Sequence, residues 1–167
     1  MKKITLLILM ISSLMVGQSF QLVKDENPSD AGLNMNCSFR EMNGKLYYLF
    51  SGESTLGNIA LYTSDGTAAG TYRISPSNVS VSDNIIISGN KIYFFATDGI
   101  NGKEPWISDG TLAGTHLLKN IHPTTVDNNF ETSSVRFLSA DATKAFFIAN
   151  DGTTGYELWV TDGTEDG

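Results

Sequence analysis

Residues 104–115 read EPWISDGTLAGT, and the chain carries two further versions of this stretch. Residues 157–167 read ELWVTDGTEDG, and residues 60–71 read ALYTSDGTAAGT. The three Asp-Gly-Thr steps are 44 and 53 residues apart. A period of roughly 40–50 residues is typical of propellers and related repeat folds. The chain is therefore expected to be a repeat protein.

Each repeat predicts short β-strands and shows no helical hydrophobic pattern. Aromatic runs stand at 46–50, 92–96 and 145–149, and runs that lead into Asp-Gly-Thr stand at 59–64, 104–108 and 157–161. Third strands are expected at 71–75 and 115–121, and weaker fourth strands at 79–89 and 133–140. Because the aromatic runs are continuous, we expect both faces of these strands to be covered.

Two kinds of turn connect the predicted strands. Asp98-Gly99 and Asp151-Gly152 follow aromatic runs, and Asp-Gly is a strong hairpin signal. In Asp-Gly-Thr, the carboxylate is expected to accept backbone hydrogen bonds and the glycine to take a positive φ. Four antiparallel strands per repeat, packed on both faces, predict an all-β fold built from blades of a β-propeller. A β-sandwich is the alternative, since short and evenly spaced strands fit it as well.

The repeats resemble the ELWxxDGTxxGT repeat family through residues 104–115 and 157–167, and the resemblance extends over almost all of residues 22–167. It implies propeller-like β-structure in a secreted or cell-surface protein typical of Bacteroidota. Such proteins often end in a sorting domain for type IX secretion, and the family offers no catalytic residues to transfer. The first repeat departs from the motif at Ala60, which stands where the family has Glu, and the second has Pro105 where the family has Leu.

Residues 1–19 have the three parts of a secretory signal peptide. Lys2 and Lys3 precede a mostly apolar run at 4–16, and the small residues Gly17 and Ser19 follow it. The run is shorter than the roughly 20 apolar residues that a membrane-spanning helix needs. We expect cleavage after Ser19, export to the cell surface or the extracellular space, and no stable membrane span.

The ends of the sequence fall inside repeats. Residues 22–28 align with residues 117–123, which follow the second Asp-Gly-Thr turn, and the last residues stop within the third such turn. Residues 20–167 are therefore expected to hold about three repeats of an incomplete propeller, since a closed ring typically needs four to eight blades.

Composition excludes several classes of protein. The 167 residues carry a net charge of −7, which becomes −9 without residues 1–19, because that segment has two Lys and no acid. An acidic chain lacks the basic face that a nucleic-acid partner requires. A single Cys excludes an intramolecular disulfide framework and a Cys-rich zinc module.

Few residues are candidates for a site. Tyr62, Trp106 and Trp159 recur at one strand position and are candidate ligand-binding residues, with packing between blades as the alternative. Asp98 and Asp151 are candidate calcium ligands in glycine-containing loops that lack the further oxygen ligands of an EF-hand. No catalytic residue and no cofactor are predicted.

These observations predict a non-catalytic binding or scaffold module, with an extracellular glycan or protein as its partner. The alternative is the N-terminal part of a secreted polysaccharide-active enzyme whose active site lies in further blades.

Overall fold

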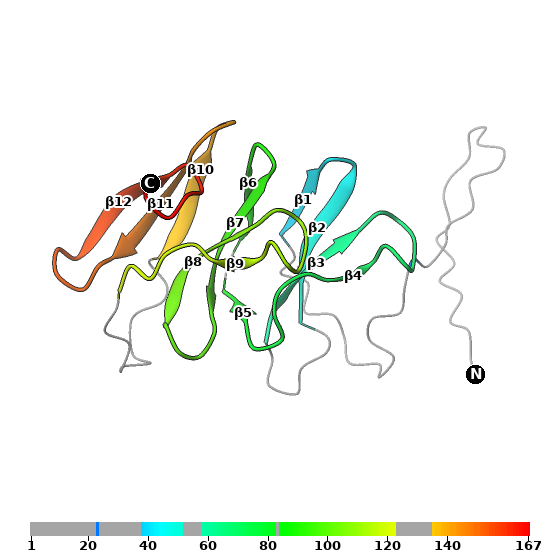
Figure 1. Cartoon of the computed structure of the whole chain (residues 1–167), viewed down its shortest axis with the longest axis horizontal. Helices are drawn as coiled ribbons and strands as arrows, with labels where there is room; N and C mark the ends of the chain where they lie inside the picture. Colours follow the sequence, from blue (N-terminus) through cyan, green and yellow to red (C-terminus); the bar gives the residue numbers. More distant parts are fainter. Residues whose placement is uncertain (1–22, 24–37, 52–57, 83, 123–134) are drawn as a thin grey trace, which may run out of the picture.

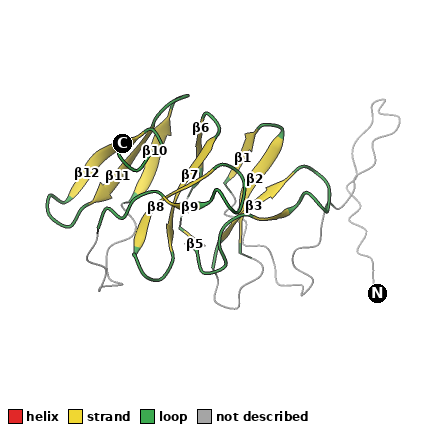
Figure 2. Ribbon diagram, in the orientation of Figure 1, coloured by secondary structure: helices red, strands yellow, loops and turns green. Residues whose placement is uncertain are grey.

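The computed structural model describes residues 23, 38–51, 58–82, 84–122 and 135–167. The predicted signal peptide at 1–19 and Cys37 lie outside the described residues. Every regular element within the described ranges is a β-strand, and all strand pairs are antiparallel (Figure 2). The all-β prediction is therefore confirmed.

The strands form three sheets that follow one another in a row in chain order (Figure 1). Sheet 1 has the order β1 (Phe39–Met42), β2 (Lys45–Phe50), β3 (Ala60–Ser64) and β4 (Tyr72–Arg73). Sheet 2 contains β5 (Ser80–Val81), β6 (Ile86–Ser88), β7 (Lys91–Thr97), β8 (Lys103–Ser108) and β9 (His116–Leu117). Sheet 3 has the order β10 (Arg136–Ala140), β11 (Ala145–Asn150) and β12 (Tyr156–Thr161).

The aromatic strands and those leading into Asp-Gly-Thr lie where the sequence predicts them, as β2, β3, β7, β8, β11 and β12. The third strands are shorter than expected, with two residues each in β4 and β9. The strand predicted at 79–89 is divided into β5 and β6, which both pair with β7. Sheet 3 has three strands in the part of the chain that the structure describes, and no third strand was predicted for its repeat.

The two central strands of each sheet pair in one common register. The residue just before Asp-Gly-Thr pairs with the residue that follows the lysine at the start of each aromatic run, as Ser64 with Leu46, Ser108 with Ile92, and Thr161 with Ala145. The next pairs on the same face bring together Tyr62 with Tyr48, Trp106 with Phe94, and Trp159 with Phe147. The three repeats are therefore equivalent residue by residue at the centre of each sheet.

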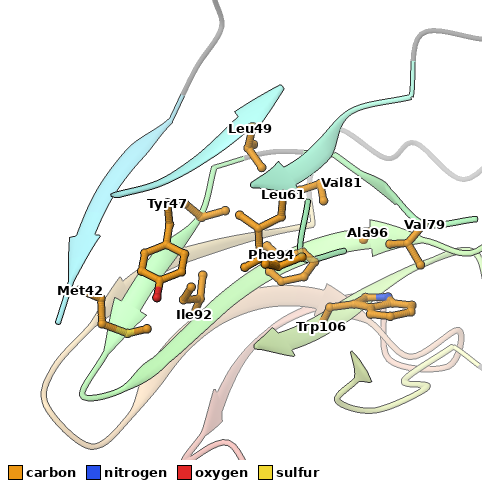
Figure 3. Close-up of a cluster of buried hydrophobic side chains, with 12 residues drawn as sticks. Met42, Tyr47, Leu49, Leu61, Val79, Val81, Ile92, Phe94, Ala96 and Trp106 are labelled. Atoms are coloured by element: carbon orange, nitrogen blue, oxygen red, sulfur yellow. The ribbon is translucent and has the colours of Figure 1, made fainter. Parts of the chain in front are cut away.

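A hydrophobic core fills the space between sheets 1 and 2 (Figure 3). Tyr47, Leu49 and Leu61 of sheet 1 meet Phe94 and Trp106 of sheet 2 in this cluster, and all five side chains are buried. Burial of large apolar side chains is the main favourable term in sheet packing. One face of sheet 1 therefore packs against one face of sheet 2.

A second core joins sheets 2 and 3 in the same way. Phe95 of sheet 2 lies 5.1 Å from the Phe137 ring and 5.9 Å from the Phe147 ring, measured between ring centroids. Tyr93 contributes a further ring pair with Phe137 at 5.6 Å. These tilted and edge contacts are favourable arrangements for aromatic rings.

The two faces of sheet 3 differ. Phe147 on one face is buried against sheet 2, whereas Leu158 and Val160 on the other face are exposed. The expectation that both faces are covered is thus correct for sheet 2 and wrong for sheet 3 among the residues that the structure describes. The continuous apolar run correctly predicts that both faces of the strand carry apolar side chains. It does not indicate which of the two faces packs against another sheet.

Candidate functional site

The Asp-Gly-Thr turn is the feature that recurs in all three sheets. Asp65 Oδ1 accepts hydrogen bonds from Thr67 N at 2.9 Å and from Thr67 Oγ1 at 2.7 Å. The Thr67 hydroxyl holds the pKa of Asp65 below its ordinary value, and the backbone N–H acts in the same direction. Asp109 and Asp162 make the same two contacts with the threonines that follow them. The prediction that this carboxylate accepts hydrogen bonds within its own turn is confirmed.

The first glycine of the turn has the expected backbone conformation. Gly66, Gly110 and Gly163 have φ of 86°, 91° and 86°, a region that residues with a Cβ rarely adopt. Their recurrence follows from this backbone requirement.

The second glycine of the motif serves another purpose, which the sequence did not reveal. A Cβ on Gly70 would overlap the Asp65 carboxylate, and a Cβ on Gly114 would overlap the Asp109 carboxylate. Gly70 N also donates to Thr67 Oγ1 at 2.9 Å. The second glycine of DGTxxGT is therefore required because the Asp carboxylate of the same turn lies directly against its backbone.

A hydrogen bond between two hydroxyl groups joins the start and the end of each complete Asp-Gly-Thr turn. Ser64 Oγ and Thr71 Oγ1 lie 2.7 Å apart, and Ser108 Oγ and Thr115 Oγ1 lie 2.6 Å apart. All four residues are buried. Buried hydroxyl groups need hydrogen-bond partners, so the terminal Thr of the motif is a structural residue.

The turn also receives a side chain from the preceding sheet. The Tyr47 hydroxyl of sheet 1 lies over Gly110 of sheet 2, where a Cβ would overlap it. In the same way, the Tyr93 hydroxyl of sheet 2 lies over Gly163 of sheet 3, and Lys91 Nζ donates to Asp162 O at 2.9 Å. Residues of the Lys-x-Tyr segment thus connect each repeat to the Asp-Gly-Thr turn of the next.

The three candidate ligand-binding residues are all at least half-buried. Tyr62 and Trp106 are buried, with 2% and 6% of their surface exposed. Trp159 is half-buried, stacks on Phe147, and donates from Nε1 to Ala149 O at 3.1 Å. The structure does not bring these side chains together, because each belongs to a different sheet. Trp106 and Trp159 pack between sheets, as the packing alternative expects, whereas Tyr62 lies outside both clusters and contacts Tyr48 and Phe50 of its own sheet.

The two candidate calcium ligands lie in separate hairpins. Asp98 accepts from Ile100 N and Asn101 N, both at 2.8 Å, and from Asn101 Nδ2 at 2.7 Å. Partial burial raises the pKa of Asp98, but the Asn101 and Ile100 N–H groups outweigh it, so its pKa lies below the ordinary value.

Asp151 accepts from the backbone N–H groups of Thr154 and Thr153 and from both threonine hydroxyls. These contacts, led by the backbone bond from Thr154, hold the pKa of Asp151 far below its ordinary range. Within the described ranges, no three His, Cys, Asp or Glu side chains come together as a metal site would require. Both carboxylates organise their own loops.

Glu104 is the most buried carboxylate in the described part of the chain, and its role was not apparent from the sequence. Its side chain is 3% exposed and accepts from Ile121 N at 2.9 Å and from His122 N at 3.0 Å. Burial raises the pKa of Glu104, and the two N–H groups act in the opposite direction. In the second repeat, the motif Glu therefore fixes the segment that leaves β9.

The first repeat has Ala60 at the position of Glu104 and holds the matching segment by other means. Arg73 Nε donates to Ser75 O at 2.8 Å, and Arg73 Nη2 donates to Pro76 O at 2.6 Å and to Val79 O at 3.1 Å. A carboxylate that accepts N–H groups is thus replaced by a guanidinium that donates to carbonyl groups. The sequence contained one signal for these contacts: Glu104 and Arg73 are charged residues within otherwise apolar predicted strands.

In comparisons with known proteins, no family model, no curated protein and no solved structure matched the chain. A search of the described residues found no helix long and apolar enough to cross a membrane.

Proposed function

We propose that this protein is an exported repeat module of the ELWxxDGTxxGT type, whose sheets are blades of a β-propeller. Its role is to bind an extracellular glycan or protein, or to serve as a scaffold at the cell surface, without catalysis by the residues described above.

One observation carries the proposal. The residues that recur between repeats are engaged in folding contacts: the aspartates in their turns, the second glycines under carboxylates, and the tyrosines on the next turn. Recurrent contacts of this kind build a regular scaffold from successive units. A scaffold of this type offers a broad surface whose specificity resides in the loops that vary between repeats.

The export part of the proposal rests on residues 1–19, with their basic start, apolar run and small residues. The strongly acidic remainder is compatible with a protein that stays soluble at high concentration outside the cell.

The experiment expresses the full chain with its own leader in a Gram-negative host, beside a control in which Met replaces residues 1–19. Mass spectrometry of the exported product should show that the N-terminus begins at residue 20. The control should remain inside the cell. A full-length chain retained in the cytoplasm would contradict export.

The exported product is then applied to a glycan array and used in a pull-down against extracellular proteins from the same kind of bacterium. Saturable binding in either assay supports the binding role. Absence of binding in both would contradict it.

A further inference from the structure

Glu104 lies at one end of a line of four polar side chains in sheet 2. Asn101 Nδ2 donates to Asp98 Oδ2 at 2.7 Å, and Asn120 Nδ2 donates to Asn101 Oδ1 at 3.1 Å. The oxygen of the Asn120 amide lies 3.2 Å from Glu104 Oε1. The line therefore joins the loop between β7 and β8, the segment after β9, and the buried carboxyl group of β8.

The last contact in this line brings two acceptor atoms together. An amide oxygen and an ionised carboxylate oxygen both accept hydrogen bonds, and neither can donate one. Asn120 Oδ1 also lies 3.2 Å from the carbonyl oxygen of His122, which is a third acceptor. The line thus lacks one donor at Glu104.

Rotation of the amide groups does not supply this donor. If Asn120 alone rotates, its oxygen faces Asn101 Oδ1 at 3.1 Å. If Asn101 rotates as well, its oxygen faces Asp98 Oδ2 in place of the present hydrogen bond. Each rotation moves the opposed acceptors along the line, so the missing donor is a proton on one of the two carboxyl groups.

The surroundings decide which carboxyl group carries the proton. Asp98 accepts three N–H groups, which favour its ionised form. Glu104 is 3% exposed, and burial favours its protonated form. Of the nearby charges, Asp98 also favours the protonated form of Glu104, and His122 opposes it. Lys119 on the same segment donates to Glu165 O instead.

We propose that Glu104 carries this proton and acts as a pH-sensitive switch between sheets 2 and 3. The protonated carboxyl donates from Oε1 to Asn120 Oδ1, and the same hydroxyl oxygen accepts the N–H of His122. Loss of the proton leaves two acceptors face to face, so the Asn120 amide rotates or moves away. Its hydrogen bond to Asn101 is lost in either case.

The switch reaches sheet 3 through His122. A Cβ on Gly152 would overlap the His122 imidazole, so this side chain lies directly against the hairpin that Asp151 organises. Release of Asn120 loosens the segment that holds His122 in place. Acid therefore tightens this contact between the sheets, and rising pH loosens it. The inference is independent of export and of any ligand.

The first experiment measures the titration of Glu104 in the purified full chain. Carbon-13 NMR of a sample labelled at the glutamate carboxyl groups follows each signal over pH, and the signal that is missing in Glu104→Gln belongs to Glu104. We expect a midpoint above the ordinary 4.5. A midpoint at or below 4.5 would overturn the proposal.

The variant Asn120→Ala tests the direction of the hydrogen bond. The midpoint of Glu104 should fall by about half a pH unit to one pH unit, because the protonated form loses its acceptor. If the Asn120 amide instead donated to the carboxylate, the midpoint would rise in this variant. A rise or an unchanged midpoint refutes the proposal. Asn120 is exposed, so the fold tolerates the substitution.

The matched control is Asn90→Ala, at an exposed asparagine next to the start of β7, whereas Glu104 pairs with Ala96 near the end of that strand. The midpoint of Glu104 should not change in this control. A shift as large as that in Asn120→Ala would count against a local contact and against the proposal.

Hydrogen exchange tests the release of the segment in the unmodified chain. The protection factors of the Ile121 and His122 amides, corrected for the intrinsic effect of pH on exchange, should fall as the pH rises through the midpoint of Glu104. In Glu104→Gln, the same two factors should be independent of pH. Constant factors in the unmodified chain would show that Glu104 titrates without releasing the segment and would overturn the switch.

Discussion

Sheets 2 and 3 share one register but differ in their surroundings. Sheet 2 is packed on both faces, so Phe94 and Phe95, which point in opposite directions from β7, are both buried. Sheet 3 has Phe147 buried and Ile148 half-buried at the matching positions of β11. The comparison teaches that the repeat sets the register position of each residue, whereas the contribution of that residue to stability depends on the neighbouring sheet.

The largest effect is expected when one apolar side chain is truncated at the same register position in sheets 2 and 3. Phe95→Ala should lower the free energy of unfolding by about 3–5 kcal/mol, because it opens a cavity between sheets 2 and 3. Ile148→Ala at the equivalent position should cost about 1 kcal/mol, since only part of that side chain leaves water on folding. Urea unfolding of the two variants and the unmodified chain measures both values. Equal losses would mean that the outer face of sheet 3 is covered like that of sheet 2.

Glu104 of sheet 2 and Glu157 of sheet 3 occupy the same motif position and allow a second comparison. Glu104→Gln replaces one carboxylate oxygen that accepts a backbone N–H with a donor, and should cost about 1–3 kcal/mol. Glu157→Gln at the equivalent exposed position should change stability by no more than about 0.5 kcal/mol. Thermal unfolding of the two variants side by side provides the comparison.

The pH dependence of the Glu104 pair has a definite sign. Because burial raises the pKa of Glu104 above its ordinary 4.5, the native state holds its proton more tightly than the unfolded state does. The stability contributed by this group is therefore fully present below pH 4.5 and declines as the pH rises through the folded-state pKa. The advantage of the unmodified chain over Glu104→Gln should shrink across that range, and an advantage that grows with pH would show the pKa to be lowered.

The turn glycines allow a comparison between a covered and an open turn. Gly110→Ala and Gly66→Ala both place a Cβ at positive φ, at a cost of about 1–2 kcal/mol each. Gly110→Ala should cost roughly 1 kcal/mol more, because its Cβ also displaces the Tyr47 hydroxyl. Adding Tyr47→Phe to Gly110→Ala should reduce that excess, which a double-mutant cycle in urea would detect.

The smallest effect is expected at Tyr93. Its buried hydroxyl has no hydrogen-bond partner among the described residues, and burial raises the pKa of the Tyr93 phenol. Tyr93→Phe, which installs the residue that the third repeat has at this position, should be neutral or stabilising by up to about 1 kcal/mol. A loss of more than that would reveal a partner for the hydroxyl, and the melting temperature measured by circular dichroism is sufficient to decide.

Much of the local structure was predictable because it depends on neighbours in the chain. Asp65 bonds to Thr67 two residues away, and Gly66 meets a conformational requirement of its own backbone. The contacts of the candidate site were harder to predict from the sequence. Glu104 contacts residues 17 and 18 positions later, and the space that Gly110 leaves is filled by Tyr47, 63 positions earlier. Contacts over such separations leave no periodic signal in a single sequence.

The sequence by itself determined that this chain forms short antiparallel strands joined by Asp-Gly turns, because continuous aromatic runs and turn chemistry act over a few residues. It also determined that the three repeats are equivalent, since the spacing within the motif fixes the strand register. Only the tertiary structure decided which faces are covered: Phe95 and Ile148 occupy the same position, and burial depends on the sheet that packs against each. The physical reason is that the hydrophobic effect follows the surface removed from water, which depends on an adjacent sheet and is encoded elsewhere in the chain.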